Sequence, residues 1–263
     1  MAIESTDDHQ ILDEILLADD PTEGLWWLVE SGRAESVLPE LPALQLEQDP
    51  VHRHKDVLAH TIAVTAKTST RLTIRLAALF HDIGKPATRS FQHGGVTFRH
   101  HEAVGARMAR ARLGELGYDD QFVADVSELV RLSGRFKGYA DGWSDAAVRR
   151  YARDAGPLLG DLNELVRCDC TTRNPKKVAR LQRDIDELES RIAALAEEDR
   201  RAAERPLIDG NEVMVILDIP PGPIVGRAAK WLLELRRSQP DLDRHDSIER
   251  LRSWAAEQGQ TPD

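Results

Sequence analysis

Most apolar residues of this chain recur at the three- and four-residue spacing of an α-helix, and only one short segment has the pattern of strands. Residues 88–98 hold two short runs around His93-Gly94-Gly95, which predicts a small β-hairpin. The helix-like segments are residues 10–18, 24–31, 55–67, 71–82, 100–117, 119–132, 146–155, 157–170, 178–195, 210–217, 222–237 and 246–257. We therefore expect an all-α fold, a helical bundle with a small β-hairpin and a C-terminal helical extension.

Local signals mark where several of these helices begin and end. Gly84 and Pro86 are expected to stop the helix over 71–82, and Ser144 is expected to cap the helix that follows it. The apolar residues of 178–195 follow spacings of three and four, which is a heptad seam. This seam favours a long helix packed on its own domain, with an intermolecular coiled coil as the alternative.

Charge and hydropathy exclude several classes of protein. The chain has 263 residues, with 35 Lys+Arg against 45 Asp+Glu and a formal net charge of −10. It has no apolar run of about 18 residues and no signal-peptide pattern, so we expect a cytoplasmic protein without a membrane partner. The net charge disfavours general nucleic-acid binding. However, residues 131–183 carry 12 Lys+Arg and 6 Asp+Glu, which leaves room for a local RNA-binding groove.

The two cysteines add little to this picture. Cys168 and Cys170 are separated by one residue and no second pair exists, so a structural zinc site is not expected. We interpret them as reduced cysteines in a helix.

The most informative residues are His81 and Asp82, which end the apolar helix over 71–82. A buried Asp82 would be costly unless it were paired or bound to a cation. His60 lies one helix earlier, His101 follows the hairpin, and Asp169 comes late in the chain. Imidazoles with carboxylates suit a divalent ion such as Mn²⁺, Fe²⁺, Ni²⁺ or Mg²⁺. A helix-end Asp beside a core His is the alternative for each residue taken alone.

Longer strings carry a family resemblance. His60, HDIGKP (81–86), HHEAVGA (100–106) and Asp169 resemble the H…HD…D pattern of the HD phosphohydrolase superfamily. More narrowly, the chain resembles the helical, HD-containing part of bacterial CCA-adding tRNA nucleotidyltransferases over roughly residues 11–255. The strings that support this are ADDPTEGLWWLVESGRAESVLPEL (18–41), LAALFHDIGKPATR (76–89), VTFRHHEAVGARMARARL (96–113), CDCTTRN (168–174) and LIDGNEVMVILDIPPGPIVGRA (207–228). The resemblance implies a neck-like helical segment (1–50), an HD phosphohydrolase domain (51–205) and a C-terminal helical extension (206–263).

The sequence departs from this family in two places. Only about ten residues precede the matching region, so we do not expect the nucleotidyltransferase head or nucleotide addition by this chain. The Asp-x-Asp strings at 184–186 and 241–243 follow neither a strand nor a Gly-Ser pair, and we interpret them as solvated faces. Ser133 and Lys137 stand where histidines are usual in the family. Their presence favours a single divalent ion, with the implied ligands His60, His81, Asp82 and Asp169.

The resemblance also suggests roles in phosphate chemistry. Lys85 is expected to neutralise phosphate oxygens, with a solvated helix-end lysine as the alternative. His101 is the expected proton donor to the leaving oxygen, and His100 competes for that role. Arg149, Arg150 and Arg173 are expected to contact substrate together with Lys85 and His100.

These expectations combine into one hypothesis and two alternatives. The hypothesis is a metal-dependent phosphohydrolase, a phosphatase or phosphodiesterase, that acts on a phosphomonoester or 2′,3′-cyclic phosphate of a nucleotide or RNA 3′ end. One alternative is a non-catalytic RNA-binding body that acts on tRNA with a separate nucleotidyltransferase. Another is a nucleotidase for free nucleotides, which differs from the hypothesis only in its substrate.

Overall fold

The computed structural model describes residues 4–46, 56–92, 95–172, 174–239 and 241–258 of the chain. It divides into two compact units, Met1–Ala193 and Ala194–Asp263, with the division inside a long helix. The helices α1–α3 belong to the first unit in this division. The three-part division at residues 50 and 205 stays a prediction.

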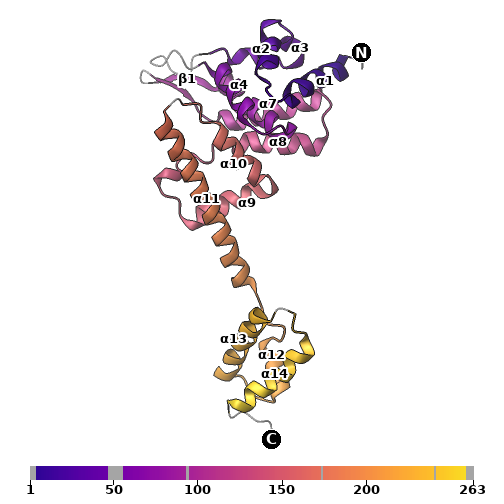
Figure 1. Cartoon of the computed structure of the whole chain (residues 1–263), viewed down its shortest axis with the longest axis vertical. Helices are drawn as coiled ribbons and strands as arrows, with labels where there is room; N and C mark the ends of the chain where they lie inside the picture. The colour runs from indigo at the N-terminus through magenta and orange to yellow at the C-terminus, as the bar shows by residue number, and fades with distance from the viewer. Residues whose placement is uncertain (1–3, 47–55, 93–94, 173, 240, 259–263) are drawn as a thin grey trace. The chain divides into compact units, whose positions relative to one another are not determined.

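The described elements are almost entirely helical (Figure 1), as the sequence predicts. No helix within the described ranges combines the length and the apolar character needed to span a bilayer. The helices of the first unit are α1 (Glu4–Leu17), α2 (Thr22–Glu30), α3 (Ala34–Val37), α4 (Val57–Lys67), α5 (Leu72–Phe80), α6 (Lys85–Thr88), α7 (His101–Glu115), α8 (Asp120–Leu132), α9 (Asp145–Ala155) and α10 (Leu159–Cys168). Single 3-10 turns are η1 (Pro42–Leu44), η2 (Tyr139–Asp141) and η3 (Gly156–Leu158).

A short antiparallel hairpin is the only sheet in the described residues. β1 (Arg89–Gln92) pairs with β2 (Gly95–Phe98), and Arg89 lies opposite Phe98 in the register. The predicted turn residues His93 and Gly94 lie outside the described residues. The predicted hairpin is thus confirmed in its two strands.

The helix α5 is the centre of the first unit. Its residues from Ile74 to Phe80 are all buried, and it contacts α1, α4, α7, α8 and α10. A helix segment that is covered on every side must be apolar on every side, and the buried residues of α5 are apolar apart from Arg75. The residues that follow α5 therefore emerge in the middle of the unit.

Arg75 is the one charged residue within α5, and it joins this helix to the end of α1. Its side chain is 1% exposed and donates hydrogen bonds to the carbonyl oxygens of Leu16, Ala18 and Asp19. The last carbonyls of a helix have no partner within the helix, so a guanidinium that caps them stabilises both groups. Sequence reasoning did not identify this contact.

The long helix α11 (Pro175–Ala203) crosses the boundary between the units, and its part up to Ala193 packs on the first unit. Ile185 and Leu188 of the heptad seam are buried, and Glu189 accepts a hydrogen bond from Asn163 of α10. This packing agrees with the intramolecular interpretation of the seam.

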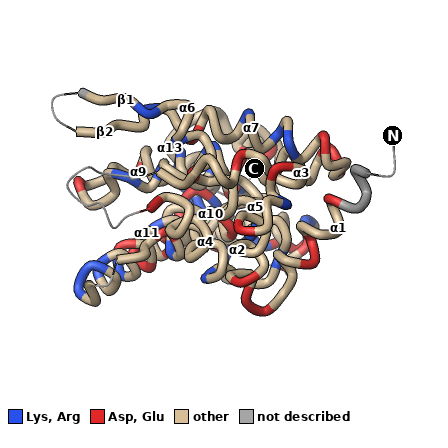
Figure 2. The backbone as a smooth tube through the Cα atoms, turned by 90° about the horizontal axis from the view of Figure 1, so that it is seen from above, with Lys and Arg blue, Asp and Glu red and all other residues tan. Residues whose placement is uncertain are grey.

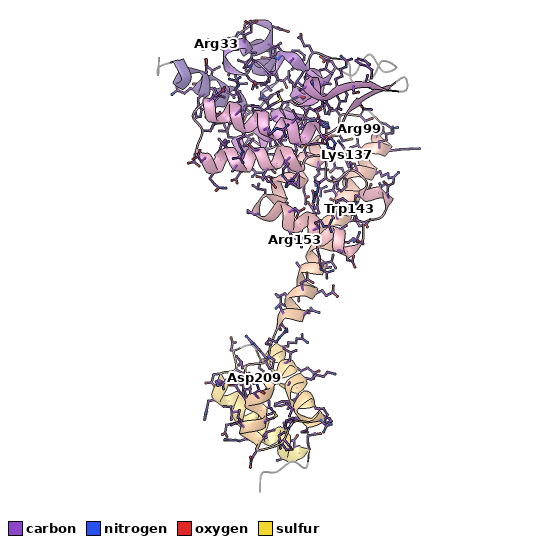
Figure 3. All side chains as sticks on the ribbon, turned by 180° about the vertical axis from the view of Figure 1, so that it is seen from behind. Arg33, Arg99, Lys137, Trp143, Arg153 and Asp209 are labelled. Atoms are coloured by element: carbon purple, nitrogen blue, oxygen red, sulfur yellow. The ribbon has the colours of Figure 1, made fainter. Side chains whose placement is uncertain are left out.

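The second unit has its own core. It holds α12 (Gly210–Leu217), α13 (Pro223–Ser238) and α14 (Arg244–Glu257), which bury Val213, Leu232 and Leu251 among others. Asp209, labelled in Figure 3, starts α12 with a capping box that includes Glu212. Trp231 stacks on Trp254 with ring centroids 5.6 Å apart.

Gly84 has a different role from the one predicted. Its φ of −81° is right-handed, so it is not a left-handed helix cap, and α6 begins directly after it. A Cβ at this position would overlap the carbonyl oxygen of His101 and lie 2.7 Å from the amide nitrogen of Gly105. Glycine is needed here because α7 passes too close for any side chain.

We predict that Gly84→Ala destabilises the fold by about 1–3 kcal/mol, since the added methyl group overpacks rigid backbone. Chemical denaturation followed by circular dichroism measures the change. Gly114→Ala is the matched control, because nothing lies within 4 Å of a Cβ there. That variant should be neutral or gain about 0.5–1 kcal/mol. Equal stability of the two variants would contradict the close approach of α7.

Candidate metal centre

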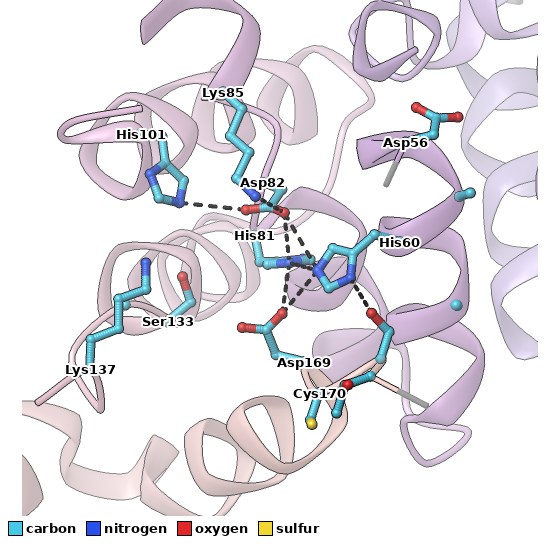
Figure 4. Close-up of a pocket in the computed structure, with 15 residues that line it drawn as sticks. Asp56, His60, His81, Asp82, Lys85, His101, Ser133, Lys137, Asp169 and Cys170 are labelled. Atoms are coloured by element: carbon cyan, nitrogen blue, oxygen red, sulfur yellow. Dashed lines mark hydrogen bonds and ion pairs between the residues drawn. The ribbon is translucent and has the colours of Figure 1, made fainter. Parts of the chain in front are cut away.

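Four side chains come together in the first unit, one from within a helix and three from the residues that directly follow two other helices. His60 lies on α4, whose first turn is capped by Asp56 through the amide of Leu58. His81 and Asp82 follow α5, and Asp169 follows α10 (Figure 4). Because the end of α5 lies in the core, both His81 and Asp82 are 3% exposed.

The donor atoms of these residues converge. One ligand atom each from His60, His81 and Asp82 lies within 4.8 Å of the others. The Nε2 atoms of His60 and His81 are 3.3 Å apart, and Nε2 of His81 is 3.2 Å from Oδ2 of Asp82. Oδ1 of Asp169 lies 3.0 Å from Nε2 of His60 and 3.5 Å from Nε2 of His81. All four predicted ligands are therefore brought together.

Hydrogen bonds behind the imidazoles turn their Nε2 atoms toward this cluster. Nδ1 of His81 donates to the carbonyl oxygen of Ala78 at 2.6 Å. Nδ1 of His60 is hydrogen-bonded to Oγ1 of Thr171 at 2.9 Å. Such outer contacts fix the ring orientation in metal sites. Sequence reasoning missed Thr171, whose only signal is its place two residues after Asp169.

The charges in the cluster stabilise one another. Burial alone would lower the pKa of His81, but the carboxylates of Asp82 and Asp169 outweigh it and raise that pKa to about 10. Burial alone would raise the pKa of Asp82, but His81, His101 and Lys85 hold it well below its usual range. Burial opposes ionisation of Asp169 too, and the two histidines again lower the pKa. The site is thus built for a positive charge between two carboxylates.

Lys85 forms a buried ion pair with Asp82. Its Nζ lies 2.6 Å from Oδ2 of Asp82, and the residue is 6% exposed. The alternative of a solvated lysine at a helix end is therefore wrong. The predicted contact with phosphate oxygens stays a prediction, and it would require the ammonium to share or leave this buried pair.

The two candidate proton donors have different environments. His101 is buried at the start of α7, where Nδ1 is hydrogen-bonded to the carbonyl oxygen of Phe98 at 2.7 Å and Nε2 lies 3.5 Å from Oδ1 of Asp82. His100 is exposed and has a left-handed backbone with a φ of 62°. The structure has a large cavity beside the converging residues, described below, and His101 lines it while His100 does not. Both histidines line a smaller recess beside that cavity.

The main cavity measures about 950 Å³ and opens above the cluster. Besides the four converging residues, its walls include Lys85, His101, Ser133, Lys137 and Cys170. Ser133 and Lys137, which occupy the positions of usual family histidines, thus face the cavity (Figure 4). Cys168 ends α10 and Cys170 lies beyond it, so the prediction of two helical cysteines is correct only for Cys168.

Two further predicted substrate contacts, Arg149 and Arg150, do not line this cavity. Arg149 is half-buried and Arg150 is exposed on α9, and neither belongs to the described lining. Arg173 lies outside the described residues. Basic and acidic residues both occur along this part of the backbone (Figure 2). Arg167, for example, pairs with Asp186 and Glu189. The positive excess over 131–183 is therefore partly neutralised by ion pairs.

The donor set fits a divalent cation. Two imidazole nitrogens and two carboxylate oxygens are the ligands that first-row divalent ions accept, and carboxylates also suit Mg²⁺. The Nε2 atoms of His60 and His81 can lie this close together when they share one proton or bind one cation. The residues His60, His81, Asp82 and Asp169 are thus suited to hold an ion, and the donor types do not select one metal.

Comparison with known proteins gives matches that span this site. Residues 57–198 match the HD domain. The chain is 36% identical over 234 residues to the CC-adding tRNA nucleotidyltransferase of Thermus thermophilus. The aligned residues make up 85% of this chain and 50% of that protein. It is 33% identical over 233 residues to the A-adding tRNA nucleotidyltransferase of Deinococcus radiodurans, which covers 86% of this chain and 52% of that protein.

The chain spans about half the length of the curated relatives it matches. The HD match covers more than half of the chain and includes His60, His81, Asp82 and Asp169. On this basis, the chain belongs to the HD domain family.

Proposed function

We propose that the chain is a metal-dependent phosphohydrolase that acts on a phosphomonoester or 2′,3′-cyclic phosphate of a nucleotide or RNA 3′ end. The observation that carries this proposal is the convergence of His60, His81 and Asp82 on one point at the wall of a large cavity. Its volume of about 950 Å³ lies in the range of small-molecule sites, which is roughly 300–1,000 Å³.

The ion would be held by His60, His81, Asp82 and Asp169. When bound, a divalent ion polarises the phosphate and stabilises the charge that develops on it. Thr171 and the carbonyl of Ala78 keep the two imidazoles turned inward. Lys85 keeps the Asp82 carboxylate ionised and in place, so we assign it a positioning role.

His101 is the proposed proton donor to the leaving oxygen. It lines the cavity, and the hydrogen bond of its Nδ1 to Phe98 leaves Nε2 directed toward Asp82. An imidazole must carry a proton on the nitrogen that faces the leaving oxygen to act as this acid. His100 does not line the main cavity.

We predict that Asp82→Asn abolishes phosphohydrolysis and weakens Mn²⁺ binding by more than about 100-fold, since outer partners of metal ligands alone contribute about 10–100-fold. Isothermal titration with Mn²⁺ and release of p-nitrophenol from p-nitrophenyl phosphate measure the two effects. Asp120→Asn is the control, because Asp120 is exposed in the first turn of α8. Equal Mn²⁺ affinity and turnover in the two variants would refute the metal mechanism.

A second candidate function is binding of tRNA without catalysis, in concert with a separate nucleotidyltransferase. The observation that favours it is the similarity to two tRNA nucleotidyltransferases over 85% and 86% of this chain. The two candidate functions differ in whether they need the ion-binding residues, because a protein that only binds tRNA needs no reaction at Asp82.

We predict that the double substitution of Arg149 and Arg150 by Gln weakens binding to a bulk tRNA sample. It should also flatten the salt dependence of binding, by about one unit of slope for each phosphate that the variant no longer neutralises. Fluorescence anisotropy at several salt concentrations measures both changes. Lys230 on α13 gives the control variant Lys230→Gln. Unchanged binding and slope in the double variant would exclude α9 as part of an RNA surface.

A further inference from the structure

Two lysines of the described residues line the main cavity, and their surroundings differ. Lys85 is buried and bonded to Asp82. Lys137, which Figures 3 and 4 label, has a side chain that is 68% exposed. A ligand that enters the cavity can reach the ammonium of Lys137 without breaking a buried ion pair. The same ligand could engage Lys85 only at the expense of the Asp82 carboxylate.

Glu102 holds Lys137 in its place beside the cluster. Nζ of Lys137 lies 3.1 Å from Oε1 of Glu102, and Oε2 of the same carboxylate lies 3.3 Å from Nδ1 of His101. Glu102 therefore links the exposed ammonium to His101, which in turn faces Asp82. The contacts thus connect the exposed Lys137 to Asp82 through Glu102 and His101.

Gly134 makes room for this arrangement. A Cβ at Gly134 would overlap Oε1 of Glu102 and lie 2.8 Å from its Cδ. The turn after α8 therefore passes directly over the Glu102 carboxylate, and it carries Ser133 and Lys137 on the cavity side. A side chain at Gly134 would displace the carboxylate that positions Lys137.

The charge of Lys137 bears on which phosphate the cavity accepts. An ammonium has three N–H donors, and among the described residues Lys137 pairs with Glu102 alone. A phosphate monoester near neutral pH carries close to two negative charges and three terminal oxygens. A diester carries one charge and two such oxygens. Coulomb attraction grows with the product of the charges, so the ammonium favours the monoester.

We propose that Lys137 binds the phosphate of the substrate and makes the site selective for phosphate monoesters, such as a terminal phosphate of a nucleotide or RNA, over diesters. This inference rests on the proposed phosphohydrolase function and, because a 2′,3′-cyclic phosphate is a diester with one charge, it favours the phosphomonoester among the substrates proposed there. It assigns the phosphate contact to Lys137 and leaves Lys85 as the partner of Asp82.

The test compares p-nitrophenyl phosphate with bis(p-nitrophenyl) phosphate in the presence of Mn²⁺. Lys137→Met should raise KM for the monoester about 10-fold, the effect expected for one charge-assisted hydrogen bond, while kcat changes less than about threefold. KM for the diester should rise only about threefold, since the attraction to one negative charge is about half as strong. Lys137→Arg should keep the preference of the wild type, and Lys230→Met should change neither KM.

The outcomes separate the two claims. Equal effects on monoester and diester, or no effect on either, would overturn the role of Lys137 while the phosphohydrolase function stands. Hydrolysis of neither substrate by the wild-type protein would overturn the proposed function. In that case, titration of the purified protein with inorganic phosphate tests whether Lys137 binds phosphate. A Kd about 10-fold weaker in Lys137→Met supports the phosphate-binding role, and an unchanged Kd refutes it.

Discussion

The carboxylate of Asp82 is buried at the end of an apolar helix, and the surrounding structure compensates its charge. A buried carboxylate without partners would cost several kcal/mol, but His81, His101 and Lys85 all approach this one. The same arrangement keeps Asp82 ionised and directed at the two imidazoles. The stability of the core and the chemistry of the site thus depend on the same interactions.

Close contacts between separate segments of the chain place these partners around Asp82. Arg75 ties α5 to the end of α1 and so fixes the helix that ends at the site. Gly84 lets the start of α7 lie against the turn after α5, which brings His101 to Asp82. Gly134 lets the turn after α8 lie on Glu102. Each of these approaches joins segments that are distant in sequence.

Sequence patterns predicted the longer helices and the hairpin strands, and the family resemblance supplied the four converging residues, but the short helices α3 and α6 were not predicted. Periodicity reports which face of a helix is apolar, and the HD strings identify the polar residues at the helix ends. They could not predict Arg75 as a cap for α1, nor Thr171 as the partner of His60, because both interactions depend on tertiary packing. For the same reason, the sequence did not show the close approach of α7 to Gly84 or the different surroundings of Lys85 and Lys137.

The central claim is that His60, His81, Asp82 and Asp169 form a metal centre. The most direct measurement is anomalous scattering from crystals of the protein soaked in Mn²⁺. We predict one peak between the Nε2 atoms of His60 and His81 and the carboxylates of Asp82 and Asp169. An empty cluster in crystals that bind Mn²⁺ elsewhere, or a peak held by other residues, would contradict it.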